Sequence, residues 1–197
     1  YGKAILPTPV IGGVGLIENV HRRASVGFKA PGETIILLGE TKGWLGCSLY
    51  LRTVVGRDDG APPPVDLAAE RRAGVYVRGL IHDGLVSTCH DVSDGGVLVA
   101  LAEMAIAGGI GAEIDPLYDK VPWHAWLFGE DQGRYLVTVA DSDPKRIVSA
   151  AEEAGVEARI IGVTVGGSLK ISGANPISVE QLVRAHEGWF AKYMAHS

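Results

Sequence analysis

The stretch HDVSDGGVLVALAEMA, residues 90–105, places several polar side chains and two glycines directly before an unbroken apolar run. A glycine has no side chain to hold a ligand away from the backbone amides, and the first turn of a helix carries unpaired N–H groups and a partial positive charge. This combination suits a phosphate or a carboxylate. The candidate site residues are His90, Asp91, Ser93, Asp94, Gly95 and Gly96.

The two aspartates limit what this stretch can bind. Asp91 and Asp94 would repel an anion unless a divalent cation lay between them, or unless both carboxylates turned away to accept hydrogen bonds from amines or hydroxyls. A structural interpretation needs no ligand, because Ser93 or Asp94 can cap the helix while His90 and Asp91 form a local turn network. Spacing alone favours the structural interpretation without excluding the anion site.

Two further stretches hold residues that could take part in chemistry. KGWLGCS, residues 42–48, is a glycine-rich turn before a short helix predicted through Leu51, but it lacks the lysine that follows the second glycine of a nucleotide-binding P-loop. In LFGEDQGRYLV, Glu130 and Asp131 precede a strand. A solvated loop explains this acidic pair at least as well as an acid/base role.

The histidines and cysteines suggest no reactive or metal-binding set. His21, His124 and His186 have no partner at metal-ligand spacing, and we interpret all three as structural, with His186 a core histidine on the last helix. Cys47 and Cys89 lack CxxC spacing, so we expect buried free thiols. The sequence itself therefore nominates no histidine or cysteine for nucleophilic catalysis and none for a metal site.

The composition excludes several classes of protein. The 197 residues are 47% hydrophobic and 21% charged, as in ordinary soluble domains. The 18 basic and 23 acidic residues give a net charge of -5 without a basic tract, which argues against nucleic acid as a partner. No apolar run approaches the roughly 18 residues of a membrane helix, so we expect no membrane partner and a cytoplasmic location. The first residue, Tyr1, indicates a fragment or a processed chain.

The spacing of apolar residues predicts helices over residues 66–84, 96–108, 144–155 and 178–194. The predicted capping residues are Asp66, Asp143 with Pro144 behind it, and Ser178 with Gln181. The expected buried faces are Ala73, Val77, Leu80 and Ile81; Val97, Leu101, Met104 and Ala105; and Leu182, His186, Trp189 and Tyr193.

Strands are predicted over residues 34–39, 134–140, 158–165 and 168–172, the last two joined in a hairpin by Gly166 and Gly167. Strands interleaved with helices in this order predict an α+β fold with helices packed on a mixed β-sheet.

The first residues are expected to belong to another unit. The segment ILPTPVIGGVGLIENV is kept extended by its prolines and resembles a strand entering a sheet edge. We place a domain boundary near residue 28, so that residues 1–28 end one domain and residues 29–197 form the α+β domain.

Four segments, taken in order, resemble the C-terminal part of the large subunit of phosphoribosylformylglycinamidine synthase of the small bacterial type. They are PTPVIGGVGLIENV, LLGETKGWLGCSLYL, HDVSDGGVLVALAEMAIAGG and LFGEDQGRYLVTV. The resemblance covers nearly the whole chain. It implies membership of the superfamily of ATP-dependent enzymes that includes aminoimidazole ribonucleotide synthetase, selenophosphate synthetase and thiamine monophosphate kinase.

The resemblance implies a ligase that converts formylglycinamide ribonucleotide, ATP and glutamine-derived ammonia to formylglycinamidine ribonucleotide, ADP and phosphate. It also implies Mg²⁺, a glutaminase subunit, a small bridging subunit and N-terminal domains of the same polypeptide. The chain would be the end of the second ATP-binding domain followed by the final α+β domain. The family's catalytic histidines and its GNVSLYNE-like motif lie outside this chain, so we expect the fragment alone to be inactive and to bind neither ATP nor metal.

The resemblance also makes the HDVSDGG stretch a candidate wall of the substrate or nucleotide cleft. In LGCSLY, Cys47 and Leu49 stand where the family more usually has Gly and Glu, which weakens the prediction of phosphate binding at that turn. The alternatives are a non-catalytic binding or scaffold module of the same fold, and a selenophosphate synthetase or thiamine monophosphate kinase relative.

Overall fold

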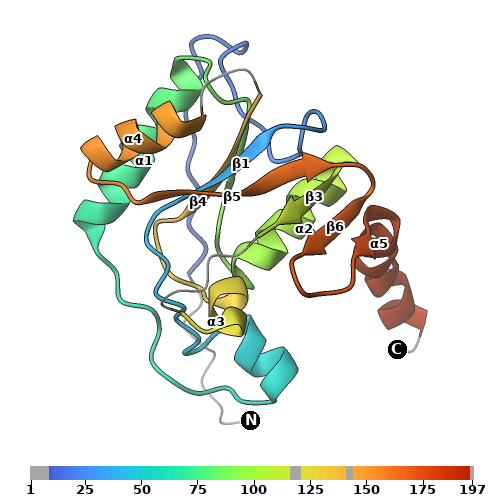
Figure 1. The fold of residues 1–197 in the computed structure, drawn as a ribbon. Coiled ribbons are helices and arrows are strands. Elements are labelled where there is room, and N and C mark those ends of the chain that lie inside the picture. The colour runs from blue at the N-terminus through green and yellow to red at the C-terminus, as the bar shows by residue number, and fades with distance from the viewer. Residues whose placement is uncertain (1–8, 116–120, 141–143, 196–197) are drawn as a thin grey trace.

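The computed structural model describes residues 9–115, 121–140 and 144–195, which form a mixed sheet with helices on both faces (Figure 1). The seven strands follow the order β2-β4-β1-β5-β3-β6-β7, and every neighbouring pair is antiparallel except β3 and β6. The α+β prediction is confirmed. The strands are β1 (Thr34–Leu38), β2 (Thr88–Asp91), β3 (Gly111–Ile114), β4 (Tyr135–Val139), β5 (Ala158–Val165), β6 (Ser168–Ile171) and β7 (Ile177–Ser178).

The helices form two layers. On one face, α1 (Leu67–His82) and α4 (Pro144–Glu153) lie side by side (Figure 1). The opposite face is covered by α2 (Gly96–Gly108), α3 (Trp123–Phe128) and α5 (Val179–Ala195). A π-helical turn, η1 (Leu51–Val55), lies four residues beyond Cys47 and extends the predicted short helix. No helix in the described ranges combines the length and the low charge needed to span a bilayer.

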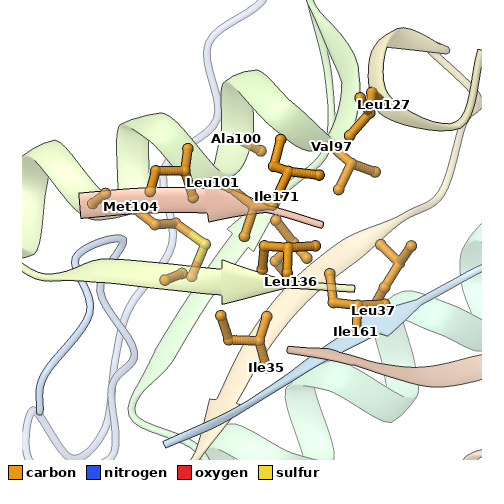
Figure 2. Packing of buried hydrophobic residues seen from close by; sticks show 14 of the residues in the cluster. Ile35, Leu37, Val97, Ala100, Leu101, Met104, Leu127, Leu136, Ile161 and Ile171 are labelled. Atoms are coloured by element: carbon orange, nitrogen blue, oxygen red, sulfur yellow. The ribbon is translucent and has the colours of Figure 1, made fainter. Parts of the chain in front are cut away.

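Strand β1 shows why its sequence is apolar throughout. Ile35 and Leu37 point into the core with α2, and Figure 2 shows Leu37 beside Ile161 within the cluster that also holds Leu136 and Leu101. Their neighbours Ile36 and Leu38 point into the other core, with α1 and α4. Because side chains alternate along a strand and both faces are covered, alternation of apolar and polar residues is lost.

The predicted caps of α1 and α5 are confirmed. Asp66 accepts hydrogen bonds from the amides of Ala68 and Ala69, both at 3.0 Å. At the start of α5 the Ser178 hydroxyl accepts from the Gln181 amide at 3.1 Å, and the Gln181 side chain accepts from the Ser178 amide at 2.9 Å. The predicted cap Asp143 lies outside the described residues.

The predicted buried faces hold for α1 and α2 but not for α5. Residues Ala73, Val77 and Leu80, and Val97, Leu101, Met104 and Ala105, are buried, while Ile81 is half-buried. In α5 only Val179 is buried, and His186, Trp189 and Tyr193 are exposed. The prediction of a core histidine at 186 is therefore wrong, because α5 packs on the sheet only through its first turns and then extends beyond it (Figure 1).

The predicted hairpin between β5 and β6 is also wrong. Strand β3 lies between them, antiparallel to β5 and parallel to β6. The Gly111 amide donates to the Gly166 carbonyl. The Gly166–Gly167 turn therefore crosses over the start of β3, and β5 and β6 do not pair with each other. Strand β3 is four residues long and begins with glycine, which leaves little periodicity to detect.

The described part of the N-terminal segment does not form the expected strand. Residues 9–18 have no regular structure, and the apolar side chains of Val10, Val14 and Leu16 are fully exposed. A strand needs a neighbour for its N–H and C=O groups, and these residues find none in the described ranges. The chain first meets the sheet at Ser25, which bridges Thr88 in parallel.

Candidate functional site

The HDVSDGG stretch begins as a strand and not as a turn. His90 and Asp91 end β2, which pairs with β4, so the predicted turn at these two residues is wrong, whereas their local side-chain contacts are present. His90 Nε2 lies 2.8 Å from Glu103 on α2, and His90 Nδ1 lies 3.3 Å from Asp91. The Ser93 hydroxyl donates to the other Asp91 oxygen. Three side chains of the stretch, His90, Asp91 and Ser93, therefore form a line of polar contacts with Glu103 of α2 at the end of the strand.

The protonation states of Asp91 and of the neighbouring Cys89 are set by their surroundings. The hydrogen bond from Ser93 is the main cause that lowers the pKa of Asp91, so Asp91 is a carboxylate at neutral pH. Behind it, burial raises the pKa of Cys89 to about 11, which keeps that residue a thiol. Ser93 and Asp94 are exposed, and the Asp94 carboxylate has no hydrogen-bond partner in the described part of the chain.

The start of α2 has no side-chain cap, so the predicted cap at Ser93 or Asp94 is wrong. Gly95 occupies the N-cap position with φ 81°, and Gly96 follows with φ 72°. The Gly95 amide donates instead to the Glu130 carboxylate at 2.8 Å. The anion attracted by this helix N-terminus is thus supplied by the chain itself.

Close packing explains the second glycine without a ligand. A Cβ atom on Gly96 would lie 2.6 Å from the carbonyl oxygen of Gly129 and 2.8 Å from that of Leu127. These distances are shorter than van der Waals contact, and the left-handed backbone adds strain for any side chain. Gly96 therefore lets α2 pack directly on the end of α3.

Glu130 joins the two glycine-containing turns. The same Glu130 oxygen that accepts from Gly95 also accepts from the Leu49 amide at 2.7 Å. We call this arrangement of Leu49, Gly95 and Glu130 the Glu130 junction. It brings residues 42–49 against residues 93–96, and it contradicts the interpretation of Glu130 and Asp131 as a solvated loop.

Asp131 and Arg134 hold the other side of the same turn. Asp131 is 6% exposed and accepts from the amides of Gly43 and Trp44 at 2.9 and 3.3 Å. Arg134, 1% exposed, donates to the Gly129 carbonyl at 2.6 Å and to the Thr41 hydroxyl at 3.2 Å, with Asp131 3.8 Å from its guanidinium. Burial lowers the pKa of Arg134 to about 10, and the charge of Asp131 opposes that shift. Arg134 stays protonated at neutral pH.

The turn at residues 42–48 differs from its predicted form. Cys47 is exposed, so the prediction of a buried thiol is wrong for this residue. It has φ 59°, and its thiol donates to the Gly60 carbonyl at 3.0 Å. A side chain at this left-handed position is strained.

This strain predicts an inverted order of stability for two variants. In regular structure, a protein with alanine at a given position is usually more stable than one with glycine by about 0.5 to 1 kcal/mol. At the left-handed φ of residue 47 we expect the reverse, with the free energy of unfolding of Cys47→Gly about 1 kcal/mol higher than that of Cys47→Ala. Both variants lose the thiol hydrogen bond, so the comparison isolates the backbone. Urea unfolding measures the difference, and a more stable alanine variant would show that Cys47 is unstrained.

An aromatic stack links the residues after the turn at 42–48 to α3. Tyr50 stacks on Phe128 and His124 of α3, with ring centroids 5.0 and 5.9 Å apart. His124 and His21 are exposed. Within the described residues, no three His, Cys, Asp or Glu side chains are placed to hold a metal ion together.

Solved structures share this fold. A chain titled T. maritima PurL complexed with FGAR superposes with a TM-score of 0.69 at 20% identity, covering 83% of this chain and 30% of that one. Thiamine-monophosphate kinase from Stenotrophomonas maltophilia K279a gives a TM-score of 0.52 at 19% identity, covering 76% and 53%. At such low sequence identity, the superpositions show only that the fold is shared.

Sequence comparison is more specific. The chain is similar to the phosphoribosylformylglycinamidine synthase subunit PurL of Rhodopseudomonas palustris strain HaA2, 57% identical over 194 residues, and of Parvibaculum lavamentivorans, 55% identical over 196 residues. Each match covers 98% of this chain and 26% of the relative, so the chain spans about a quarter of their length. The family model for the AIR synthase related protein, C-terminal domain, matches residues 30–173. The chain therefore belongs to the family of AIR synthase related C-terminal domains.

Proposed function

We propose that the chain is the C-terminal part of the large subunit of phosphoribosylformylglycinamidine synthase, a carbon–nitrogen ligase of purine biosynthesis. The observation that carries this proposal is the identity of 57% along 98% of the chain with a subunit of that name. In the reaction, ATP phosphorylates the amide oxygen of formylglycinamide ribonucleotide. Ammonia from glutamine then displaces the phosphate, giving formylglycinamidine ribonucleotide, and Mg²⁺ neutralises the triphosphate.

The rest of the enzyme lies outside the chain in this proposal. Residues 1–28 end a preceding ATP-binding domain, which is supported by the exposed apolar side chains of residues 9–17 and by a family match that starts at residue 30. Neighbouring T. maritima structures are titled as PurL complexes with ATP and as PurLQS, which supports ATP use and a multi-subunit assembly. The proposed partners are a glutaminase subunit and a small bridging subunit, in the cytoplasm.

Within this enzyme, the HDVSDGG stretch forms part of the wall of the substrate or nucleotide cleft. Its outward-facing groups are Asp91, Ser93 and Asp94, while Gly95 and Gly96 face the protein. The ligand-facing part of the stretch is then its side chains and not its backbone amides, because Glu130 occupies the Gly95 amide. We expect the isolated chain to be inactive.

A chimera tests the proposed function. The matching 194 residues of the R. palustris HaA2 subunit are replaced by this chain, and ADP release is followed with formylglycinamide ribonucleotide and ammonia. We expect kcat/KM within about tenfold of the parent, which is about 1.4 kcal/mol in the barrier. A chimera that unfolds cooperatively like the parent but lacks this turnover, or that turns over only thiamine monophosphate or selenide, would contradict the proposal.

Asp94→Ala in the chimera tests the role of the cleft wall. Because the Asp94 carboxylate caps nothing, its removal should change the free energy of unfolding by less than about 0.5 kcal/mol while lowering kcat/KM about tenfold. Glu187→Ala on α5 is the control for loss of an exposed carboxylate and should leave both quantities unchanged. Full activity of the Asp94 variant would place this residue outside the cleft.

A further inference from the structure

A groove with a cavity of about 730 Å³ runs between α1 and α4, on the face of the sheet opposite α2 and α5. Figure 1 shows these two helices side by side. The side chains of Tyr76, Leu80 and Ile147 form its apolar floor. Its walls are small residues, Gly79, Ala150 and Ala154, which leave the space between the helices open.

Helix α1 carries a second stripe toward this groove. Its buried stripe is Ala73, Val77 and Leu80. The groove is lined by residues 68, 71, 72, 75, 76, 79, 80 and 83, so Leu80 belongs to both, and 68, 72, 75 and 79 form the outer row of this lining. This spacing of four, three and four residues is the spacing at which one helix presents a seam to another. Val75, in the middle of the stripe, is 52% exposed, so the seam is uncovered in this chain.

Positive charges stand at both ends of the groove. The Arg72 side chain reaches across to the end of α4, where a Cβ on Gly155 would lie 3.6 Å from it, and Arg71 is beside it. Arg146 stands at the start of α4. None of the three arginines has a hydrogen bond or an ion pair in the described part of the chain, but Arg72 is close enough to Asp66 to contribute to the lowered pKa of that carboxyl. Asp83 is the one acidic residue of the lining and lies 3.4 Å from His82.

We infer that this groove binds an acidic amphipathic helix of a partner protein. The floor is apolar, and its one hydroxyl, on Tyr76, already donates to the Ile147 carbonyl at 2.7 Å, so a sugar or a base would find no partner there. A small amphiphile with a single anionic head would leave the arginines at one end unpaired. A helix with an apolar stripe and acidic residues near both of its ends would pack the stripe on the floor and pair its carboxylates with the arginines at both ends of the groove.

The length of the groove sets the length of its ligand. Residues 68–83 of α1 and its C-cap span about 22 Å at a rise of about 1.5 Å per residue, which corresponds to a partner helix of about four turns. The whole chain has a net charge of -5, whereas the groove lining has three arginines and one aspartate. The groove therefore favours an acidic ligand although the protein as a whole is negatively charged. The inference does not depend on the proposed enzymatic function.

The test uses a synthetic peptide of about 15 residues, with leucines on one stripe and glutamates at both ends, and a matched peptide with lysines in place of the glutamates. Fluorescence anisotropy measures binding to the 197-residue chain. We expect the acidic peptide to bind at least about tenfold more tightly than the basic one, and the double variant Arg71→Glu, Arg72→Glu to weaken its binding about tenfold. Arg78→Glu, on the same helix but outside the groove, should change binding less than about twofold.

Filling the groove provides the second arm. Ala150→Trp should abolish peptide binding, whereas Ser149→Trp, one residue away and outside the groove, should not; thermal unfolding checks that both variants fold. Equal binding of the two peptides, or equal loss in Arg78→Glu, would overturn the inference. Binding of the anionic dye anilinonaphthalene sulfonate that Ala150→Trp removes, without binding of the acidic peptide, would identify a small-amphiphile site and would also overturn it.

Discussion

Replacing Arg134 with methionine is expected to lower the free energy of unfolding by about 3 to 5 kcal/mol. Arg134 is 1% exposed, and methionine fills a similar volume without its donors. The change leaves the Gly129 carbonyl and the Thr41 hydroxyl without their partner and leaves Asp131 buried without its countercharge. The Gly129 carbonyl and the Asp131 carboxylate are buried and Thr41 is half-buried, so water recovers little of the loss at the first two groups.

Urea unfolding of Arg134→Met measures this loss. Arg134→Lys keeps the charge but not the planar fork of donors, and should lie between the wild type and the methionine variant. Arg78→Met on the exposed side of α1 is the control and should change stability by less than about 0.5 kcal/mol. Equal effects of the substitutions at 134 and 78 would mean that the Arg134 network contributes nothing to folding.

The second large effect is expected at Gly96. Gly96→Ala adds a Cβ that collides with the backbone of residues 127–129 and also strains a left-handed φ of 72°, so we expect a loss of about 3 to 5 kcal/mol. Gly109→Ala at the other end of α2 has the same left-handed conformation, with φ 67°, but no atom within 4 Å of the new Cβ. It should lose only about 1 to 2 kcal/mol.

The difference between these two glycine variants isolates the contact of α2 with α3. Thermal and urea unfolding give both values. If Gly96→Ala and Gly109→Ala lost the same free energy, backbone strain alone would explain Gly96, and close approach of α2 and α3 would not be its reason.

Helices with local signals could be predicted from the sequence. Asp66 and the Ser178–Gln181 box act within three residues of themselves, so their hydrogen bonds depend on the local chain. Helix α2 is apolar almost throughout, with Glu103 as its one charged residue, so a buried helix ending at Gly108 could be predicted from its own residues. By contrast, the burial of α5 depends on where the sheet ends, which no local pattern encodes.

The order of the strands could not be predicted. Strands β2 and β3 have four residues each, and β3 lies between β5 and β6, the two strands that the Gly166–Gly167 turn predicts as a hairpin. Pairing of that kind is decided by long-range packing, because a short strand has little propensity of its own.

Part of the candidate site, its two glycines, could be predicted from the sequence, but the residues that contact them could not. Gly95 and Gly96 were identified because adjacent glycines before a helix are a local signal, but their partner Glu130 is 35 residues away along the chain, and Leu49 is 81 residues from Glu130. One available signal was the charge pattern of GEDQGRYLV: an arginine entering an apolar strand must be paired, and Asp131 stands three residues before it.

The Glu130 junction is the central claim about the site, and amide hydrogen exchange of Glu130→Ala tests it directly. A hydrogen bond to a carboxylate contributes about 1.5 to 3 kcal/mol, so we expect exchange at Leu49 and Gly95 to accelerate together by about 10- to 100-fold. Glu130→Gln, which keeps an acceptor oxygen, should accelerate both amides less. The amide of Val156, bonded to Ala151 in the other core, should be unchanged. Acceleration at only one of the two amides, or at neither, would contradict the account.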